Sequence, residues 1–132
     1  GATSGRVIVG QYTGEKLKLT EVHRFANAFY ELRDNCYWNL GGLWQEITKG
    51  LLEAKRLFPD LASVGVDTWG VDHVFLNEQG RLLFPTHAYR DQRTHGILQQ
   101  IREAGDASKL YEWTGLPLIN YNSALQIRES LN

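Results

Sequence analysis

Alternating hydrophobic and polar residues near the start of the chain predict two strands. Residues 6–12, "RVIVGQY", are a short β-branched run, and in residues 16–25, "KLKLTEVHRF", Leu17 and Leu19 alternate with lysines. The intervening "TGE" has the composition of a turn. Because such alternation on both sides of a turn is typical of paired strands, we expect an antiparallel hairpin here.

A spacing of three to four residues takes over at residues 42–58 and predicts a helix with one apolar face. The apolar positions are Leu43, Trp44, Ile47, Leu51, Ala54 and Phe58. Pro59 marks the end of this helix. The apolar "LASVGV" at 61–66 then predicts a strand buried on both faces, and this order of elements indicates an α/β sheet of mixed direction.

Two further segments combine turn residues with apolar ones. Residues 31–42, "ELRDNCYWNLGG", place an aromatic pair between turn formers, which fits a short strand or a loop pinned by its aromatic side chains. Residues 71–84, "VDHVFLNEQGRLLF", predict a second hairpin, in which Gly80 is free to adopt a positive φ in the turn.

Helical spacing returns after Pro85, where Ile97, Leu98 and Ile101 share one face. Helical segments are also expected at 106–115 and 122–131, the last with Asn122 or Ser123 as its N-cap.

Composition narrows the classes of partner. A chain of 132 residues fits one domain with a real core. Its 14 basic and 15 acidic residues give a net charge of −1, so nucleic acid and anionic membranes are not expected as partners, whereas small molecules and proteins are. Cys36 is the lone cysteine and no run approaches the roughly 18 apolar residues of a membrane helix. A reducing, cytoplasmic setting is therefore expected.

The first residues, "GATSGR", combine small residues, hydroxyls and a positive charge. Small residues let backbone N–H groups approach an anion, Thr3 and Ser4 add donors, and Arg6 supplies charge, so the hexapeptide can hold a polyphosphate. A frayed terminus is the alternative, because short glycine motifs are weak signals alone. A loop of this composition normally follows another element, so we expect a strand before Gly1.

The "DTWG" stretch follows the predicted buried strand, at the sheet edge where α/β proteins bind ligands. Asp67 or Asp72 can accept hydrogen bonds from sugar hydroxyls, Trp69 offers a flat apolar face, and Gly70 lets a ligand approach the backbone. Alternatively, Trp69 belongs to the core, Asp67 and Thr68 cap a turn, and Gly70 marks a bulge.

A third cluster, "HAYRDQRTHG", gathers charge before a helix. It contains His87, Tyr89, Arg90, Asp91, Arg93 and His95. It suits a polar substrate, or else Asp91 caps the helix while its neighbours pair on the surface. The four histidines lack the spacing of zinc ligands and Cys36 has no basic partner, so neither a metal site nor thiol chemistry is expected.

Together these segments resemble one family. "GATSGRV", "VGVDTWGVDHVFL" and "AYRDQRTHG", in this order and at these distances, are similar to the amino-terminal part of the FGGY family of carbohydrate kinases. "EVHRF" and "LYEWTGLPLINYNSALQIR" extend the resemblance over essentially all 132 residues. The "DTWGVD" stretch resembles the branch of this family that phosphorylates L-rhamnulose.

The resemblance implies an α/β fold of the ribonuclease H-like, actin-like ATPase type, with a mixed sheet, flanking helices and two lobes that close around ATP and sugar. Residues 1–132 would form part of the N-terminal lobe. In the family, a strand with a metal-associated aspartate precedes the glycine matched by Gly1, so the first strand is expected to be missing here.

The resemblance also implies site residues. The ATP phosphates would be contacted by Ala2, Thr3, Ser4, Gly5 and Arg6. The sugar would be contacted by Gly70, with Trp69 shaping the pocket. Thr68, Asp72 and Tyr89, together with Asp67 and Arg90, are carried over from the family less directly. The general base of the family is an aspartate in a later part of the chain, and no residue here matches it, so no catalytic residue and no metal ligand is assigned.

The implied activity of the parent protein is transfer of the γ-phosphoryl group of ATP, with Mg²⁺, to the 1-hydroxyl of L-rhamnulose. The phosphate loop and the bend at Gly70 would converge on one cleft, and this chain alone, without the remaining kinase lobe, would be inactive. Three alternatives stay open: a kinase for L-fuculose or xylulose, a non-catalytic sugar- or nucleotide-binding module, and an α/β fragment that self-associates through an exposed sheet edge.

Overall fold

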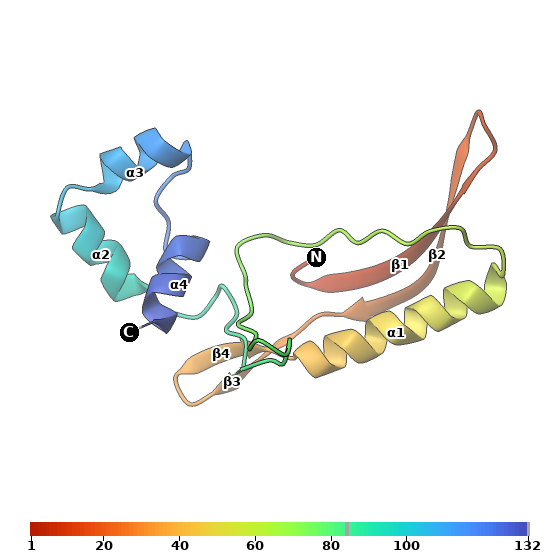
Figure 1. Cartoon of the computed structure of the whole chain (residues 1–132), viewed down its shortest axis with the longest axis horizontal. Coiled ribbons are helices and arrows are strands. Elements are labelled where there is room, and N and C mark those ends of the chain that lie inside the picture. The colour runs from red at the N-terminus through yellow and green to blue at the C-terminus, as the bar shows by residue number, and fades with distance from the viewer. Residues whose placement is uncertain (84, 132) are drawn as a thin grey trace. The chain divides into compact units, whose positions relative to one another are not determined.

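The computed structural model describes residues 1–83 and 85–131 (Figure 1). Phe84, the last residue of the second predicted hairpin, and Asn132, the last residue of the predicted lobe, lie outside the described residues. The chain forms two compact units. The first unit comprises Gly1–Phe29 and Asn39–Trp69, and the second comprises Tyr30–Trp38 and Gly70–Asn132.

The hairpin predicted at the start of the chain is confirmed. β1 (Ser4–Tyr12) pairs antiparallel with β2 (Leu17–Ala26). The register shifts between Val7 and Ile8, where β2 contributes Val22 as an extra residue. Such a bulge increases the local twist without breaking the pairing on either side.

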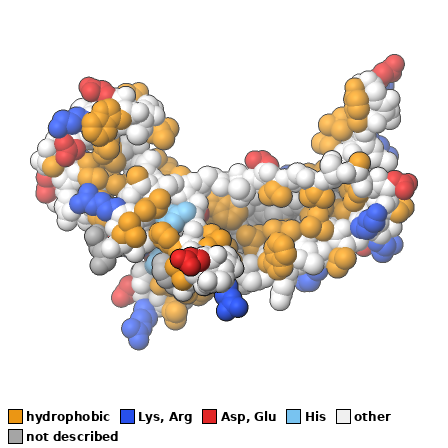
Figure 2. Space-filling model, viewed as in Figure 1, with side chains coloured by type: hydrophobic (Ala, Val, Ile, Leu, Met, Phe, Trp, Pro, Cys, Tyr) orange, Lys and Arg blue, Asp and Glu red, His pale blue; other side chains and the backbone are white. Residues whose placement is uncertain are grey.

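The two faces of this hairpin differ in how far they are buried. Val7 and His23 lie opposite each other on the face that packs against the helix α1 (Leu40–Leu57). The other face leaves large apolar side chains exposed, as Figure 2 shows over the hairpin. These side chains are Ile8, Tyr12, Leu17 and Leu19. The alternation predicted for the leucines is therefore present, and both leucines are exposed.

α1 is the helix predicted at residues 42–58. The side-chain oxygen of Asn39 caps it by accepting a hydrogen bond from the Gly42 N–H at 2.9 Å. Gly50 faces the hairpin, and a Cβ there would lie 2.4 Å from Val7 Cγ2 and 3.1 Å from His23 Cβ. Glycine at this position therefore sets how closely the helix approaches the strands.

The prediction of a buried strand at 61–66 is wrong. The segment has no regular secondary structure, and Val64 and Val66 are 67% and 89% exposed. A strand forms only with a hydrogen-bonded neighbour, and none of the described strands pairs with this segment. The described strands instead make two separate two-stranded sheets, β1–β2 and β3–β4.

The short strand expected within residues 31–42 is confirmed as β4 (Asn35–Trp38), which pairs with β3 (Phe29–Leu32). β4 also bonds to the segment after Pro85. The Trp38 N–H donates to the Thr86 carbonyl and the Ala88 N–H donates to the Cys36 carbonyl, each at 2.8 Å. These bonds fix the chain ahead of the predicted "HAYRDQRTHG" cluster.

The second predicted hairpin is present but short. The Asn77 N–H donates to the Arg81 carbonyl at 2.9 Å, and the Leu83 N–H donates to the Phe75 carbonyl at 3.0 Å. Leu76 and Leu82 form a single antiparallel bridge, and the Asn77 side-chain oxygen accepts a hydrogen bond from the Arg81 N–H at 2.9 Å. Gly80 has a φ of 73°, so the positive φ predicted for it is confirmed.

Three short helices complete the second unit: α2 (His95–Glu103), α3 (Ala107–Thr114) and α4 (Ser123–Ser130). The helical spacing predicted for them is confirmed, and Asn122 occupies the N-cap position of α4. Their core consists of Ile97, Ile101 and Leu125, with Leu98, Leu110 and Leu118 packed against it. No described helix is long and apolar enough to cross a membrane.

Candidate functional site

The five residues expected to bind phosphate lie at the start of the first unit. Ala2 and Thr3 precede β1, and Ser4, Gly5 and Arg6 are its first three residues. The Thr3 carbonyl accepts a hydrogen bond from the Asn27 N–H at 3.1 Å, which ties the segment to the end of β2. Gly5 is needed for packing, since a Cβ there would lie 2.0 Å from Phe25 Cζ. The irregular part of the predicted loop is thus limited to residues 1–3.

Arg6 stands directly opposite Arg24 across the β1–β2 ladder. Directly opposed side chains share a face, and like charges placed so repel each other. Glu21 compensates part of this charge through two hydrogen bonds from Arg24, at 2.9 and 2.7 Å. The hydrogen bonds from Arg24 lower the pKa of Glu21. Two guanidinium groups against one carboxylate leave a net positive patch beside the predicted phosphate segment, which suits an anion.

Gly70 has no internal reason to be glycine. Its φ lies outside the left-handed region, and a Cβ built on it would meet no atom within 4 Å. Neither backbone geometry nor packing among the described residues excludes a side chain there. Thr68 and Trp69, the residues before it, close the first unit, and Asp67 is exposed.

Val71 carries the strain that glycine would have relieved. Its φ is 72°, a left-handed conformation that β-branched residues avoid and that costs about 1–3 kcal/mol. The next residue, Asp72, accepts a hydrogen bond at 2.7 Å from the indole N–H of Trp38, which is only 3% exposed. The chain directly after Gly70 is therefore held in one unusual conformation by buried groups.

Tyr89 lies in an aromatic cluster with Trp38 and Tyr121. Its ring centroid is 6.4 Å from that of Trp38 and 5.7 Å from that of Tyr121, the latter edge-to-face. Arg90 donates from Nε to the Tyr89 hydroxyl at 3.2 Å. Through Trp38 the second unit thus brings together two predicted sugar contacts, Asp72 and Tyr89, that are 17 positions apart in the sequence.

The charged cluster before α2 is centred on the buried Asp91, whereas Arg90 and His95 are exposed. The Asp91 side chain is 1% exposed and accepts hydrogen bonds from the N–H groups of Cys36 at 2.7 Å and Arg93 at 2.9 Å. Its carboxylate lies 3.4 Å from the Arg93 guanidinium. The alternative that Asp91 caps α2 is wrong, since Thr94 occupies that position. Asp91 instead joins β4 to the segment that carries Tyr89.

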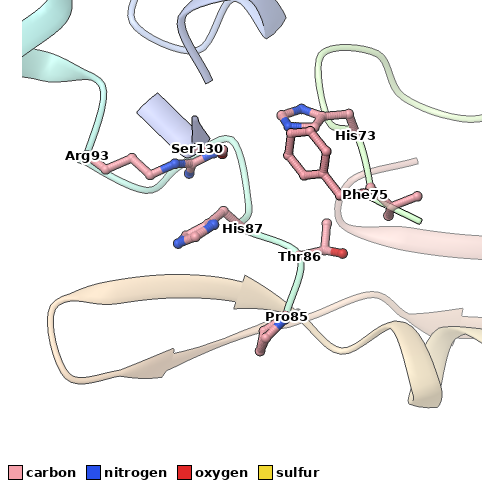
Figure 3. A pocket seen from close by; sticks show the side chains of 8 residues that line it. His73, Phe75, Pro85, Thr86, His87, Arg93 and Ser130 are labelled. Atoms are coloured by element: carbon pink, nitrogen blue, oxygen red, sulfur yellow. The ribbon is translucent and has the colours of Figure 1, made fainter. Parts of the chain in front are cut away.

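A small pocket lies beside this cluster (Figure 3). Its walls include His73, Phe75, Thr86, His87, Arg93 and Ser130, and its volume is about 10 Å³. That volume is about the minimum for one water and far below the roughly 300 Å³ of a small-molecule site. Three buried polar atoms here have no partner among the described residues: His73 Nδ1, Thr86 Oγ1 and Arg93 Nε. The pocket has the size and polarity to hold a water, not a sugar.

The surroundings of the two histidines in this pocket lower their pKa values. Burial lowers the pKa of both His73 and His87, and the nearby Arg93 lowers it further. Asp72 acts in the opposite direction on His73, as does Asp91 on His87. Both imidazoles therefore favour the neutral form in the folded chain.

A larger groove of about 390 Å³ lies among α2, α3 and α4. Ile101, Leu110, Trp113 and Leu125 form much of its wall, and none of the predicted site residues lines it. Within residues 1–83 and 85–131, no group of three or more His, Cys, Asp or Glu side chains is arranged to hold a metal ion.

Three residues that contact the predicted site residues could not be predicted from the sequence. Arg24 is visible only once the register places it opposite Arg6. Trp38 belongs to the aromatic pair noted in residues 31–42, but its bond to Asp72 spans 34 positions. Gln126 on α4, which is 1% exposed and accepts a hydrogen bond from Arg93 at 3.1 Å, gives no sequence signal, because a buried glutamine looks like any helical polar residue.

Comparison with known proteins gives a consistent result. The family described as the FGGY family of carbohydrate kinases, N-terminal domain, matches residues 1–128. The chain is 38% identical over 130 residues to a rhamnulokinase of Mannheimia succiniciproducens, 36% over 129 to one of Bacillus subtilis, and 39% over 127 to one of Bacteroides thetaiotaomicron. These alignments cover 96–98% of this chain but only 26–27% of each relative's length.

Solved structures agree on the fold. A gluconate kinase and a ligand-bound xylulose kinase, both from Lactobacillus acidophilus, each superpose on 99% of this chain with a TM-score of 0.76 at 12% identity, covering 26% of their own chains. The likeness confirms the predicted α/β fold class.

Proposed function

This chain belongs to the FGGY family of carbohydrate kinases, and on that premise we propose that its full-length gene product transfers the γ-phosphoryl group of ATP to the 1-hydroxyl of L-rhamnulose, giving L-rhamnulose 1-phosphate. The observation that carries the proposal is the 36–39% identity to three rhamnulokinases over 96–98% of the chain. Its lone cysteine fits a reducing, cytoplasmic setting.

The nucleotide end of the reaction is assigned to Ala2, Thr3, Ser4, Gly5 and Arg6. The positive patch formed by Arg6 and Arg24 supports this role, because an anion between two opposed guanidinium groups relieves their repulsion. Phosphoryl transfer depends largely on positioning and on neutralising charge, which donors of this kind supply.

The sugar end is assigned to Thr68, Trp69, Gly70, Asp72 and Tyr89. Gly70 supports this role most directly, since no described atom fills the space that a side chain would occupy. Asp72 and Tyr89 both lie against Trp38, whose indole N–H donates to Asp72 at 2.7 Å and whose ring centroid is 6.4 Å from that of Tyr89.

The rest of the catalytic apparatus is assigned to the remaining kinase lobe. A general base must accept the proton of the sugar hydroxyl, and a Mg²⁺ ion, bound mostly through nucleotide phosphates, must neutralise the moving phosphoryl group. The described residues offer no metal cluster. We therefore expect residues 1–132 alone to be inactive.

The test is a comparison of ketoses with the full-length gene product. ATP consumption is measured in parallel with L-rhamnulose, L-fuculose and D-xylulose, and the phosphorylated carbon is identified by ³¹P and ¹³C NMR. We expect the highest kcat/KM with L-rhamnulose and phosphate on its first carbon. A higher kcat/KM with another ketose would show that this ketose, and not L-rhamnulose, is the substrate. Sugar binding measured by calorimetry, without any turnover, would indicate a non-catalytic module.

A further inference from the structure

The backbone after Gly70 is bent in an unexpected place. Glycine adopts left-handed conformations freely, yet the left-handed residue is Val71, with a φ of 72°. A β-branched residue does not stay there by its own preference. Contacts elsewhere in the second unit must hold it.

Those contacts reach the carbonyl of Val71 from α4. The Ser123 hydroxyl donates to it at 2.8 Å, and Gln126 Nε2 donates to it at 3.1 Å. Residues three apart share one face of a helix, so α4 presents both donors to the same oxygen. A carbonyl has two lone pairs, and both are used here.

Gln126 is itself fixed on all sides. Its Nε2 also donates to the Tyr121 carbonyl at 3.1 Å, and its Oε1 accepts from Arg93 Nη2 at 3.1 Å. Because Arg93 only donates and the two carbonyls only accept, the amide has one possible orientation. Arg93 in turn pairs with the buried Asp91 at 3.4 Å. The chain from Asp91 through Arg93 and Gln126 to Val71 thus forms a buried polar clamp.

We propose that Gln126 is a positioning residue which, with Ser123 and Arg93, holds Val71 in its left-handed conformation and so fixes the backbone of Gly70 where the sugar binds. The inference rests on the proposed kinase function. It adds that sugar affinity depends on residues of α4 whose side chains contact the backbone of the site and not the sugar. Without the clamp, Val71 relaxes to an ordinary φ and the peptide that joins it to Gly70 turns.

The first variant for the test is Gln126→Leu in the full-length gene product, which puts an aliphatic side chain of similar size in place of the amide and removes all three hydrogen bonds. We expect KM for L-rhamnulose to rise about tenfold or more, because misplacing a site by about 1 Å can cost about a hundredfold. KM for ATP should not change. Ser123→Ala removes a single bond, so it gives a smaller rise, about threefold, in a protein that keeps its fold.

Rescue separates positioning from simple stabilisation. Asparagine tolerates the left-handed region far better than valine, so Val71→Asn in the Gln126→Leu background should lower KM for L-rhamnulose again. The matched control is Gln99→Leu, an exposed glutamine on α2 that bonds Glu103, and it should leave both KM values unchanged. An unchanged KM in Gln126→Leu and Ser123→Ala, or no rescue by Val71→Asn, overturns the proposal.

A readout independent of activity keeps this inference distinct from the proposed function. If the unmodified protein phosphorylates no ketose, the kinase proposal fails by itself. The clamp is then judged by the φ of Val71 in crystal structures of the unmodified protein and of Gln126→Leu. A negative φ in the variant alone supports the clamp, and a positive φ in both contradicts it.

Discussion

At the scale of single residues, Gly70 and Val71 differ in what they contribute to the proposed sugar site. Gly70 leaves open space where a side chain would stand, and Val71 takes the backbone strain. Residues strained in this way persist only when their surroundings over-determine them, and they cluster at functional sites. The pairing of free space with enforced geometry is what a site needs to accept a ligand close to its backbone.

Gly70→Ala tests the free space. The new methyl group meets nothing in the folded chain, so stability should hold or rise by about 0.4–1 kcal/mol, as for any tolerated glycine replacement. It would occupy the space assigned to the sugar, so KM for L-rhamnulose should rise about 10–200-fold, the cost of a methylene in a fitted pocket. Steady-state kinetics and urea denaturation of the full-length gene product give both values.

Gly65→Ala is the matched control, because its Cβ also meets no atom within 4 Å and its φ is also outside the left-handed region. It should show the same stability and an unchanged KM. Equal KM values for L-rhamnulose in the two variants would show that Gly70 does not line the sugar site.

The sequence marks some of these residues and not others, for physical reasons. Gly70 and Tyr89 each stand in a motif that can be recognised within its own short stretch of the chain. The contact of Gln126 with Val71 spans 55 positions and depends on where α4 packs. The left-handed φ of Val71 contradicts its own conformational preference, so no local rule predicts it.

At the scale of elements, the sequence predicts correctly those elements that depend on residues close together in the chain. The β1–β2 hairpin and α1 depend on neighbours a few positions away, and their alternation and helical spacing predict them well. The segment 61–66 has the composition of a buried strand but no pairing partner among the described strands. A strand is a property of a pair, so composition alone is not sufficient.

Gly50 governs the contact between α1 and the hairpin. Gly50→Ala places a methyl group 2.4 Å from Val7 Cγ2 and 3.1 Å from two atoms of His23, so the helix must shift. Overpacking of this kind costs about 1–3 kcal/mol, which exceeds the gain of about 1 kcal/mol in helix propensity. We expect a net loss in the free energy of unfolding, measured by urea denaturation.

Gly41→Ala, in the first turn of the same helix, is the matched control, because it changes helix propensity without creating a close contact. Its Cβ would meet only Asn39 Oδ1, at 3.9 Å, so it should stabilise the protein. A Gly50→Ala variant as stable as Gly41→Ala would show that the contact is not tight.

At the scale of the whole molecule, the two units differ in the chemistry that resists acid. In the second unit, burial lowers the pKa of His73 and His87 below their ordinary 6.5, so the unfolded chain binds more protons than the folded one as pH falls below that value. Its stability is complete above about pH 6.5 and declines below it. In the first unit, hydrogen bonds from Lys49 and His23 lower the pKa of Glu46 below its ordinary 4.5. That contribution is lost only as pH falls below about 4.5.

Acidification should therefore open the second unit before the first. Hydrogen exchange of the full-length gene product, followed by mass spectrometry from pH 7.5 to 5.5 and corrected for intrinsic rates, should show α2 and α4 losing protection while β1, β2 and α1 keep theirs. His87→Asn removes one of the two titrating groups and should flatten this dependence, because a neutral amide binds no proton in either state. Arg93, Asp91 and His73 are the charged or titratable groups that act on His87. Earlier loss of protection in β1 and β2 than in α2 and α4 would contradict the prediction. An equally steep fall in the protection of α2 and α4 with pH in His87→Asn would show that His87 is not the acid-sensitive group.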